Sequence, residues 1–368
     1  MTDNGWQREW DVTATAIGTD YGGEPEEAIE AVELSAIRRY CEPLEFDCPL
    51  HYDIDVAREY GYRDVLAPWS GISQTFSRRG HWRPGMSTRY PAPDRDAVIL
   101  DTELGIDPEP PSPPYSSTFA TDLEIEYHAP VCVGDRLTRS GRLLVGVVPR
   151  ETSVGRGAFL TFESRIHNQH GELVTVQRNG SYRYTPATAT AIARDGDEGR
   201  SATSATESLP ARDLPPALAS NVDWSLQRYV EDVAVGDEIP PLVIHLTIAR
   251  LVVEAGGNLD FSRVHHNTAV AHATGAPDMY ANNVFIQSWW ERAVRQYIGL
   301  AGRVRRVGPL RMRVFNTVGE TVVTHGIVTR VWDDGDEHLV EIEMRSEISR
   351  GVSVGPGPVV VSLPSRGD

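Results

Sequence analysis

The stretch Asn258-Leu259-Asp260-Phe261-Ser262-Arg263-Val264-His265-His266-Asn267 decides how this chain is interpreted. It places a carboxylate, Asp260, five residues before an imidazole, His265. Over five residues a helix turns the second side chain about 140° away from the first, and a strand puts the two on opposite faces. The two side chains therefore meet only if the backbone between them bends. A bent loop ahead of a helix is a common location for catalytic groups.

The composition is that of an ordinary globular protein. The 368 residues are 40% hydrophobic and 24% charged, which is enough for large cores and, by length, for two domains. A net charge of -17 argues against nucleic-acid binding, because phosphate recognition needs a basic surface. The three cysteines form no CxxC pair, which indicates a reducing compartment. With neither a signal-sequence pattern nor a membrane-length apolar run, we expect a cytoplasmic protein without membrane contacts.

The first half of the chain is predicted to hold one short helix and a run of strands. The helix is expected over Ala31–Tyr40, where Ser35 can act as a cap. A Pro-rich segment at about 80–117 lacks periodicity, as a lid, a binding loop or a disordered segment would. Alternating apolar residues then predict antiparallel strands at Leu123–Tyr127, Leu137–Val148, Phe159–His167 and Leu173–Tyr184. This order is an α+β pattern.

The second half repeats that order after a linker. Residues 186–215 are rich in Ala, Thr, Ser, Asp, Gly and Pro, a linker composition. A short helix is expected from about Thr247, and a second helix over Asn282–Ile298, with Gly299 as its stop. Strands are predicted around Leu310–Val314 and Val340–Met344.

The two halves align as a duplicated domain. His51 and His265 each lie ten residues before a glycine, Gly61 and Gly275 respectively, and an alanine precedes each glycine by four residues. At the position of Asp260 the first copy has Phe46. We therefore expect a first domain over residues 1–185 with a degenerate site, in which His51 is structural, and a second domain over 216–368 that carries the chemistry.

Asp260-x-x-x-x-His265, followed by Ala271, Gly275 and an apolar helix, resembles the hydratase motif of MaoC-like (R)-specific enoyl-CoA hydratases and 3-hydroxyacyl dehydratases. The resemblance covers most of the chain and implies a tandem (double) hot-dog fold, in which each half is an antiparallel sheet wrapped around a central helix. The family pattern Asp-x-Asn-Pro-Ile/Leu-His-x-Asp is altered here at three positions, and the usual His-Gly at the helix start is replaced. These departures are Ser262, Arg263, Asn267 and Asn282-Asn283.

The implied reaction is reversible hydration of an enoyl thioester. It needs a base and an acid, and donors for the enolate-like oxygen. Asp260 and His265 are the candidates for the first two roles, in either order. The alternative for this pair is a turn-capping aspartate beside a buried structural histidine. The candidates for positioning the substrate are Asn282, Asn283, Gly275 and Ser262, because a backbone N–H at a helix start suits the thioester oxygen.

The remaining expectations concern the substrate and its carrier. A basic cluster, Arg303, Arg305 and Arg306, suits the phosphates of coenzyme A or an acidic carrier protein, unless it forms a solvated strand face or loop. The thioester is expected to carry a bulky or long acyl group, with no metal or other cofactor, and the protein to form a possible homodimer. A thioesterase of the same fold and a non-catalytic acyl-binding subunit remain the alternative functions.

Overall fold

A computed structural model describes residues 5–77, 82, 84–97, 108–152, 155–186, 222–273 and 276–367. Its helices are α1 (Asp11–Ala14), α2 (Leu34–Cys41), α3 (Ile54–Glu59), α4 (Ile248–Asn258), α5 (Thr268–Ala273) and α6 (Asn283–Ile298). The strands of the first half are β1 (Glu26–Glu27), β2 (Ser117–Tyr127), β3 (Thr138–Thr152), β4 (Gly155–His167) and β5 (Leu173–Pro186). Those of the second half are β6 (Glu238–His245), β7 (Arg303–Arg311), β8 (Thr321–Asp334), β9 (Glu337–Ile348) and β10 (Gly351–Leu363).

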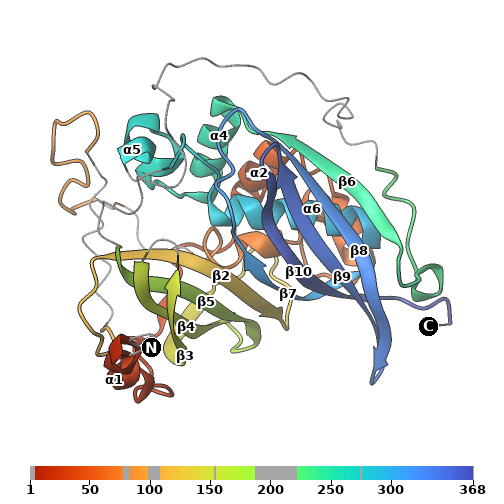
Figure 1. Cartoon of the computed structure of the whole chain (residues 1–368). Helices are drawn as coiled ribbons and strands as arrows, with labels where there is room; N and C mark the ends of the chain where they lie inside the picture. Colours follow the sequence, from red (N-terminus) through yellow and green to blue (C-terminus); the bar gives the residue numbers. More distant parts are fainter. Residues whose placement is uncertain are drawn as a thin grey trace.

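All ten strands form one antiparallel sheet in the order β1-β3-β4-β5-β2-β7-β10-β9-β8-β6. The two halves join where β2 pairs with β7, with Ile125 opposite Val307. In Figure 1 the second half of the sheet curves around α6, whereas the first half extends beside it. The expected double hot-dog architecture is confirmed, because each half contributes five strands on its own side of this junction. The expectation of a central helix in both halves was wrong for the described residues of the first half, where only a 3-10 turn, Trp69–Gly71, stands in the place of α6.

Helix α6 is the core of the second half. Asn282 begins it, since its side-chain oxygen accepts the Phe285 N–H at 2.9 Å, and Gly299 ends it with a φ of 70°. Almost every side chain along its 16 residues is buried, including Trp289 and Trp290. The predicted helix and both of its termini are therefore confirmed.

The first half has a different centre. At the position equivalent to the start of α6 the described chain forms only a 3-10 turn, Trp69–Gly71, followed by further turns up to Ser77. In the described ranges 84–97 and 108–116, the Pro-rich segment forms neither helix nor strand. The rest of that segment, and all but the first residue of the predicted linker 186–215, lie outside the described residues.

Two local predictions were wrong. Ser35 does not cap α2: the helix begins after Glu33, and the Ser35 hydroxyl, already inside the first turn, donates to the Glu33 carboxylate at 3.1 Å. The strand predicted around Leu310–Val314 ends at Arg311, because Met312 forms only an isolated bridge to Val354. The other predicted strands match β2, β3, β4, β5 and β9 in place.

The helices of the described chain include none that is both long and apolar enough to cross a membrane. The cysteines Cys41, Cys48 and Cys132 are buried and form no disulfide.

Candidate functional site

The backbone between Asp260 and His265 bends as the spacing requires. Helix α4 ends at Asn258, and Leu259 takes a left-handed conformation with a φ of 63°. The Asp260 N–H then donates to the Ala255 carbonyl at 3.0 Å and to the Asn258 side-chain oxygen at 3.1 Å. These contacts turn the chain out of the helix and fix the start of the loop.

The two predicted catalytic side chains face each other at the end of this loop. His265 Nε2 lies 3.7 Å from Asp260 Oδ2, and the side chains are 10% and 21% exposed. His265 Nδ1 lies 2.8 Å from the Tyr280 carbonyl oxygen, which leaves Nε2 directed at the carboxylate. The separation is longer than a direct hydrogen bond, and one water molecule that contacts both groups fits such a geometry.

The predicted positioning residues divide into different environments. Asn283 is the first residue of α6 and, with Leu259, lines a cavity of about 470 Å³. The Asn282 side chain is buried. Its oxygen accepts hydrogen bonds from the Phe285 N–H at 2.9 Å and from Asn258 Nδ2 at 3.1 Å, so it stabilises the start of the helix. Ser262 is exposed, and its N–H donates to Asp260 Oδ1 at 3.1 Å. Gly275 lies outside the described residues.

The carboxylate of Asp260 thus also caps the turn at Ser262, as the structural alternative predicted. The two roles are compatible, because Oδ1 accepts from the Ser262 N–H while Oδ2 faces His265. One carboxylate oxygen holds the loop conformation and the other is presented to the imidazole.

A buried carboxyl behind the site escaped the sequence analysis. Glu254 is 2% exposed, and its Oε1 accepts a hydrogen bond from the Asn258 side chain. Burial, and then the negative charge of Asp260, raise the pKa of Glu254 well above its usual range. Glu254 and Asn258 stand four residues apart in α4, the spacing of neighbours on one helix face, which was the available sequence signal.

The first copy contains the same turn, but it lacks the carboxylate that faces the histidine in the second copy. His51 Nδ1 lies 2.8 Å from the Leu66 carbonyl, and Glu45, like Leu259, is left-handed, with a φ of 49°. The Phe46 ring packs against the His51 ring with centroids 4.8 Å apart, where the second copy has a carboxylate. Burial lowers the pKa of His51 to about 3, so the imidazole stays neutral.

A carboxyl group from the second half accepts backbone hydrogen bonds in the first copy, at the position aligned with the start of α6. Glu291, fully buried in α6, accepts the Trp69 N–H at 2.7 Å and the Ser70 N–H at 2.9 Å. In the duplicated alignment Trp69 and Ser70 correspond to Asn283 and Val284. Burial raises the pKa of Glu291 to about 7, although these hydrogen bonds oppose the shift.

The predicted basic cluster lies in strand β7. Arg305 forms an ion pair with Glu337, and the Arg303 guanidinium lies 5.6 Å from the centre of the Tyr62 ring. Arg303 and Arg305 line a small cavity with Glu291 and Arg295, near the end of α6 opposite to Asn283. Arg306 is partly buried in the same strand. The strand location matches the alternative interpretation, and phosphate binding stays a prediction.

These features define a double hot-dog protein with one complete Asp/His site. The family described as FAS1-like, dehydratase domain region, matches residues 15–177. The chain is 30% identical over 163 residues to a UPF0336 protein of Saccharopolyspora erythraea, covering 44% of this chain and 85% of that protein. It is 29% identical over 164 residues to a probable enoyl-CoA hydratase alpha subunit of Thermomonospora curvata. That match spans 45% of this chain and only 48% of the relative.

Solved structures support the same architecture. A MaoC-like dehydratase superposes over 96% of this chain and 100% of its own, with a TM-score of 0.64 and 20% identity. A Mycobacterium tuberculosis protein described as a double hotdog fold covers 94% of this chain and 96% of its own, with a TM-score of 0.54 and 10% identity. The chain belongs to the same family as its 30% identical relative, a UPF0336 protein, and it has the fold of a MaoC-like dehydratase.

Proposed function

We propose that this chain is a hydro-lyase that adds water to an enoyl thioester, or removes it from a 3-hydroxyacyl thioester, with coenzyme A or an acyl carrier protein as the carrier. The observation that carries the proposal is the 3.7 Å approach of His265 Nε2 to Asp260 Oδ2 in a partly open loop. A water molecule between the two groups loses a proton to one of them as its oxygen attacks C3. The other group, as acid, delivers a proton to C2.

The negative charge that develops on the thioester oxygen needs a donor. Helical geometry leaves the N–H groups of Asn283 and Val284 without acceptors inside α6, and the helix dipole favours negative charge there. The Glu291 carboxyl group on the aligned N–H groups of Trp69 and Ser70 supports this role, because there two backbone N–H groups at the same position of the fold hold a pair of oxygens.

The first copy has no carboxylate in the place of Asp260 and has its anion-binding turn filled by Glu291. In this proposal, residues 216–368 form the catalytic domain and residues 1–185 form a degenerate domain that widens the acyl site for a bulky or long group. Residues 186–215 connect them. Arg303 is the member of the basic cluster best suited to a phosphate of the carrier, since it is exposed, and a homodimer is compatible with this arrangement.

The experiment follows a panel of short, long and ring-bearing enoyl thioesters by mass, looking for the gain of one water. Wild type is compared with Asp260→Asn and His265→Ala. Water gain that falls by about 100- to 10,000-fold in each variant supports the proposal. Release of the free thiol with the double bond intact identifies a thioesterase instead. Binding without turnover, unchanged in both variants, identifies an acyl-binding subunit.

A further inference from the structure

The two copies of the duplicated domain are related by an approximate two-fold axis. Strands β2 and β7 have the same place in the two copies: each precedes a Val-Gly-Asp or Val-Gly-Glu turn, with Gly134 at a φ of 90° and Gly319 at a φ of 86°. These two strands pair with each other in antiparallel orientation where the halves join. Across a two-fold axis each contact occurs twice, with the roles of the two copies exchanged. The contact that Glu291 makes with the first half therefore has a counterpart on the opposite side of the junction.

The counterpart of Glu291 is Ser77. Ser77 stands 214 residues before Glu291, the same spacing that separates Trp69 from its aligned residue, Asn283. Ser77 ends the described turns that begin at Trp69, and it lines the cavity of about 470 Å³ together with Asn283. Position 77 of the first half is thus placed at the start of α6, as Glu291 of the second half is placed at the turn of the first.

The side chain at this position differs in length between the two sites, and so does the space beside it. A serine side chain ends at Oγ, two bonds short of the Oε atoms of a glutamate. The cavity beside Glu291 and Trp69 measures about 70 Å³. The one beside Ser77 and Asn283 measures about 470 Å³. The short side chain therefore stands where the fold is open, and the long one where it is filled.

The acidic side chain of Asp122 also lines the large cavity, at the sheet rather than at the helix start. Its Oδ1 accepts a hydrogen bond from the Thr121 hydroxyl at 2.7 Å and lies against Gly180 of β5. Asp122 therefore does not take the place that Glu291 has in the other site.

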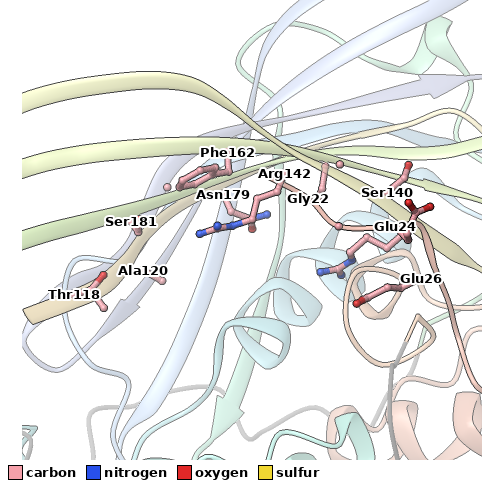
Figure 2. Close-up of a pocket in the computed structure, with 15 residues that line it drawn as sticks. Gly22, Glu24, Glu26, Thr118, Ala120, Ser140, Arg142, Phe162, Asn179 and Ser181 are labelled. Carbon is pink, nitrogen blue, oxygen red and sulfur yellow. The ribbon is translucent and has the colours of Figure 1, made fainter. Parts of the chain in front are cut away.

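The large cavity continues along the sheet of the first half. A second cavity of about 580 Å³ shares four of its lining residues, namely Ala120, Arg139, Asn179 and Gly180. Figure 2 shows Ala120, Asn179 and Ser181 on the strands that form this wall. A thioester oxygen on the Asn283 N–H therefore has room for its acyl group, provided that nothing fills the space next to Ser77.

We propose that Ser77 keeps the second site open: its short side chain leaves the N–H groups of Asn283 and Val284 to the thioester oxygen, whereas a glutamate at position 77 would occupy them as Glu291 occupies the turn of the first copy. This inference rests on the proposed hydration of an enoyl thioester. It requires no contact between Ser77 and the substrate, since the side chain is buried and acts through its length. The identities of two aligned residues, Ser77 and Glu291, then decide which of the two sites binds substrate.

The test is Ser77→Glu, which gives the second site the side chain that fills the first. We expect kcat/KM for water gain by an enoyl thioester to fall by about 100-fold or more. Binding of the saturated thioester of the same acyl group and carrier, which is not turned over, should weaken by a similar factor. Ser77→Ala keeps the side chain short and should retain both quantities within about threefold.

Gln74→Glu is the matched control. Gln74 is exposed and lines the same cavity from the same turns, so this variant adds the same charge at a position that is not aligned with Glu291. Its effects on kcat/KM and on binding should be at least about tenfold smaller than those of Ser77→Glu. If Ser77→Glu fails to fold, as urea unfolding reports, Ser77→Gln supplies the same comparison with an uncharged oxygen of equal reach.

The outcomes separate this inference from the function on which it rests. Wild-type kcat/KM in folded Ser77→Glu overturns the inference and leaves the hydratase intact. An equal loss in Gln74→Glu also overturns it, because the added charge alone then explains the effect. If no enoyl thioester gains water, but Ser77→Glu abolishes binding of the saturated thioester and Gln74→Glu does not, the inference holds and the proposed function fails.

Discussion

His51 and His265 make the same contact in the two copies of the fold: each places Nδ1 at 2.8 Å from the carbonyl oxygen of the residue 15 positions later. The shared contact fixes the orientation of both rings. What differs is the group that meets Nε2. It is the Asp260 carboxylate in the second copy, whereas in the first the Phe46 ring packs on the histidine and Nε2 has no hydrogen-bond partner among the described residues.

Because of this difference, we expect substitution of His265 to affect catalysis and substitution of His51 to affect stability. His265→Ala is expected to lower the hydration rate by about 100- to 10,000-fold. His51→Gln is expected to leave kcat/KM of the folded protein unchanged while lowering the free energy of unfolding by about 1–3 kcal/mol, since it disturbs a buried contact. Steady-state kinetics and urea unfolding of both variants check this. A loss of turnover in folded His51→Gln would contradict it.

His51 also predicts a pH dependence of stability. Burial lowers the pKa of His51 from 6.5 to about 3. Below pH 6.5 the unfolded chain therefore takes up a proton that the folded chain does not, and stability falls as the pH falls toward 3. At about pH 5 this contribution is about 2 kcal/mol.

The measurement is urea unfolding of wild type and His51→Gln at neutral pH and near pH 5. Because Glu291 and the other titrating groups are present in both proteins, their effects cancel in the difference. We expect the stability advantage of wild type over the variant to shrink by about 2 kcal/mol at the lower pH. An advantage that is independent of pH would show that His51 titrates normally.

Glu254 is expected to fix the position of the loop that carries Asp260 relative to the start of α6. Its carboxyl binds Asn258, which contacts both the Asp260 N–H and the Asn282 side chain at the start of α6. Glu254→Leu should therefore cost about 3 kcal/mol of stability, because it leaves buried amides unpaired, and should lower kcat more than it raises KM. Glu254→Gln keeps an acceptor for Asn258, and both losses should largely disappear, as kinetics and thermal unfolding can establish. Equal losses in the two variants would argue that the negative charge is required.

Glu291 is expected to behave as an internal ligand of the degenerate site. Glu291→Ala leaves the N–H groups of Trp69 and Ser70 without acceptors and should destabilise the protein by about 3–5 kcal/mol. Acetate in the buffer should restore part of that stability by occupying the vacated position. The matched control is Glu343→Ala, at an exposed glutamate of β9, which should be neutral and insensitive to acetate. Thermal unfolding with and without acetate is the measurement, and an equal response of the two variants would refute the internal-ligand interpretation.

The local elements followed from the sequence because they depend on near neighbours. Helix α6 was predicted over Asn282–Ile298 from its apolar spacing, with Gly299 as its stop, whereas the role of Asn282 as its N-cap was seen in the structure. Most strands were predicted by their period of two. Ser35 was misjudged as a cap, since propensity alone does not say which residue starts the first turn of a helix.

The pairing of Asp260 with His265 was predicted from the repeat and the motif, and the structure brings them together. The sequence does not single out Glu254, because an acidic residue in a helix is usually solvated, and it is the packing of α4 against α2, the turn Glu42–Leu44 and α6 that buries it. Glu291 lies far in sequence from Trp69 and Ser70, the residues it binds, so no local pattern connects them.

Periodicity, capping and motif spacing act over a few residues, and for that reason the duplicated α+β pattern, its turns and the residues able to do acid and base chemistry were predictable from the sequence. The folded structure was needed to show which of the two sites is open, that Glu291 fills the other, and that a cavity lies between Asn283 and strands of the first half. Those properties depend on burial and on contacts between α6 and turns of the other copy, such as Trp69–Gly71, which are distant in the chain and meet only when both halves share one sheet.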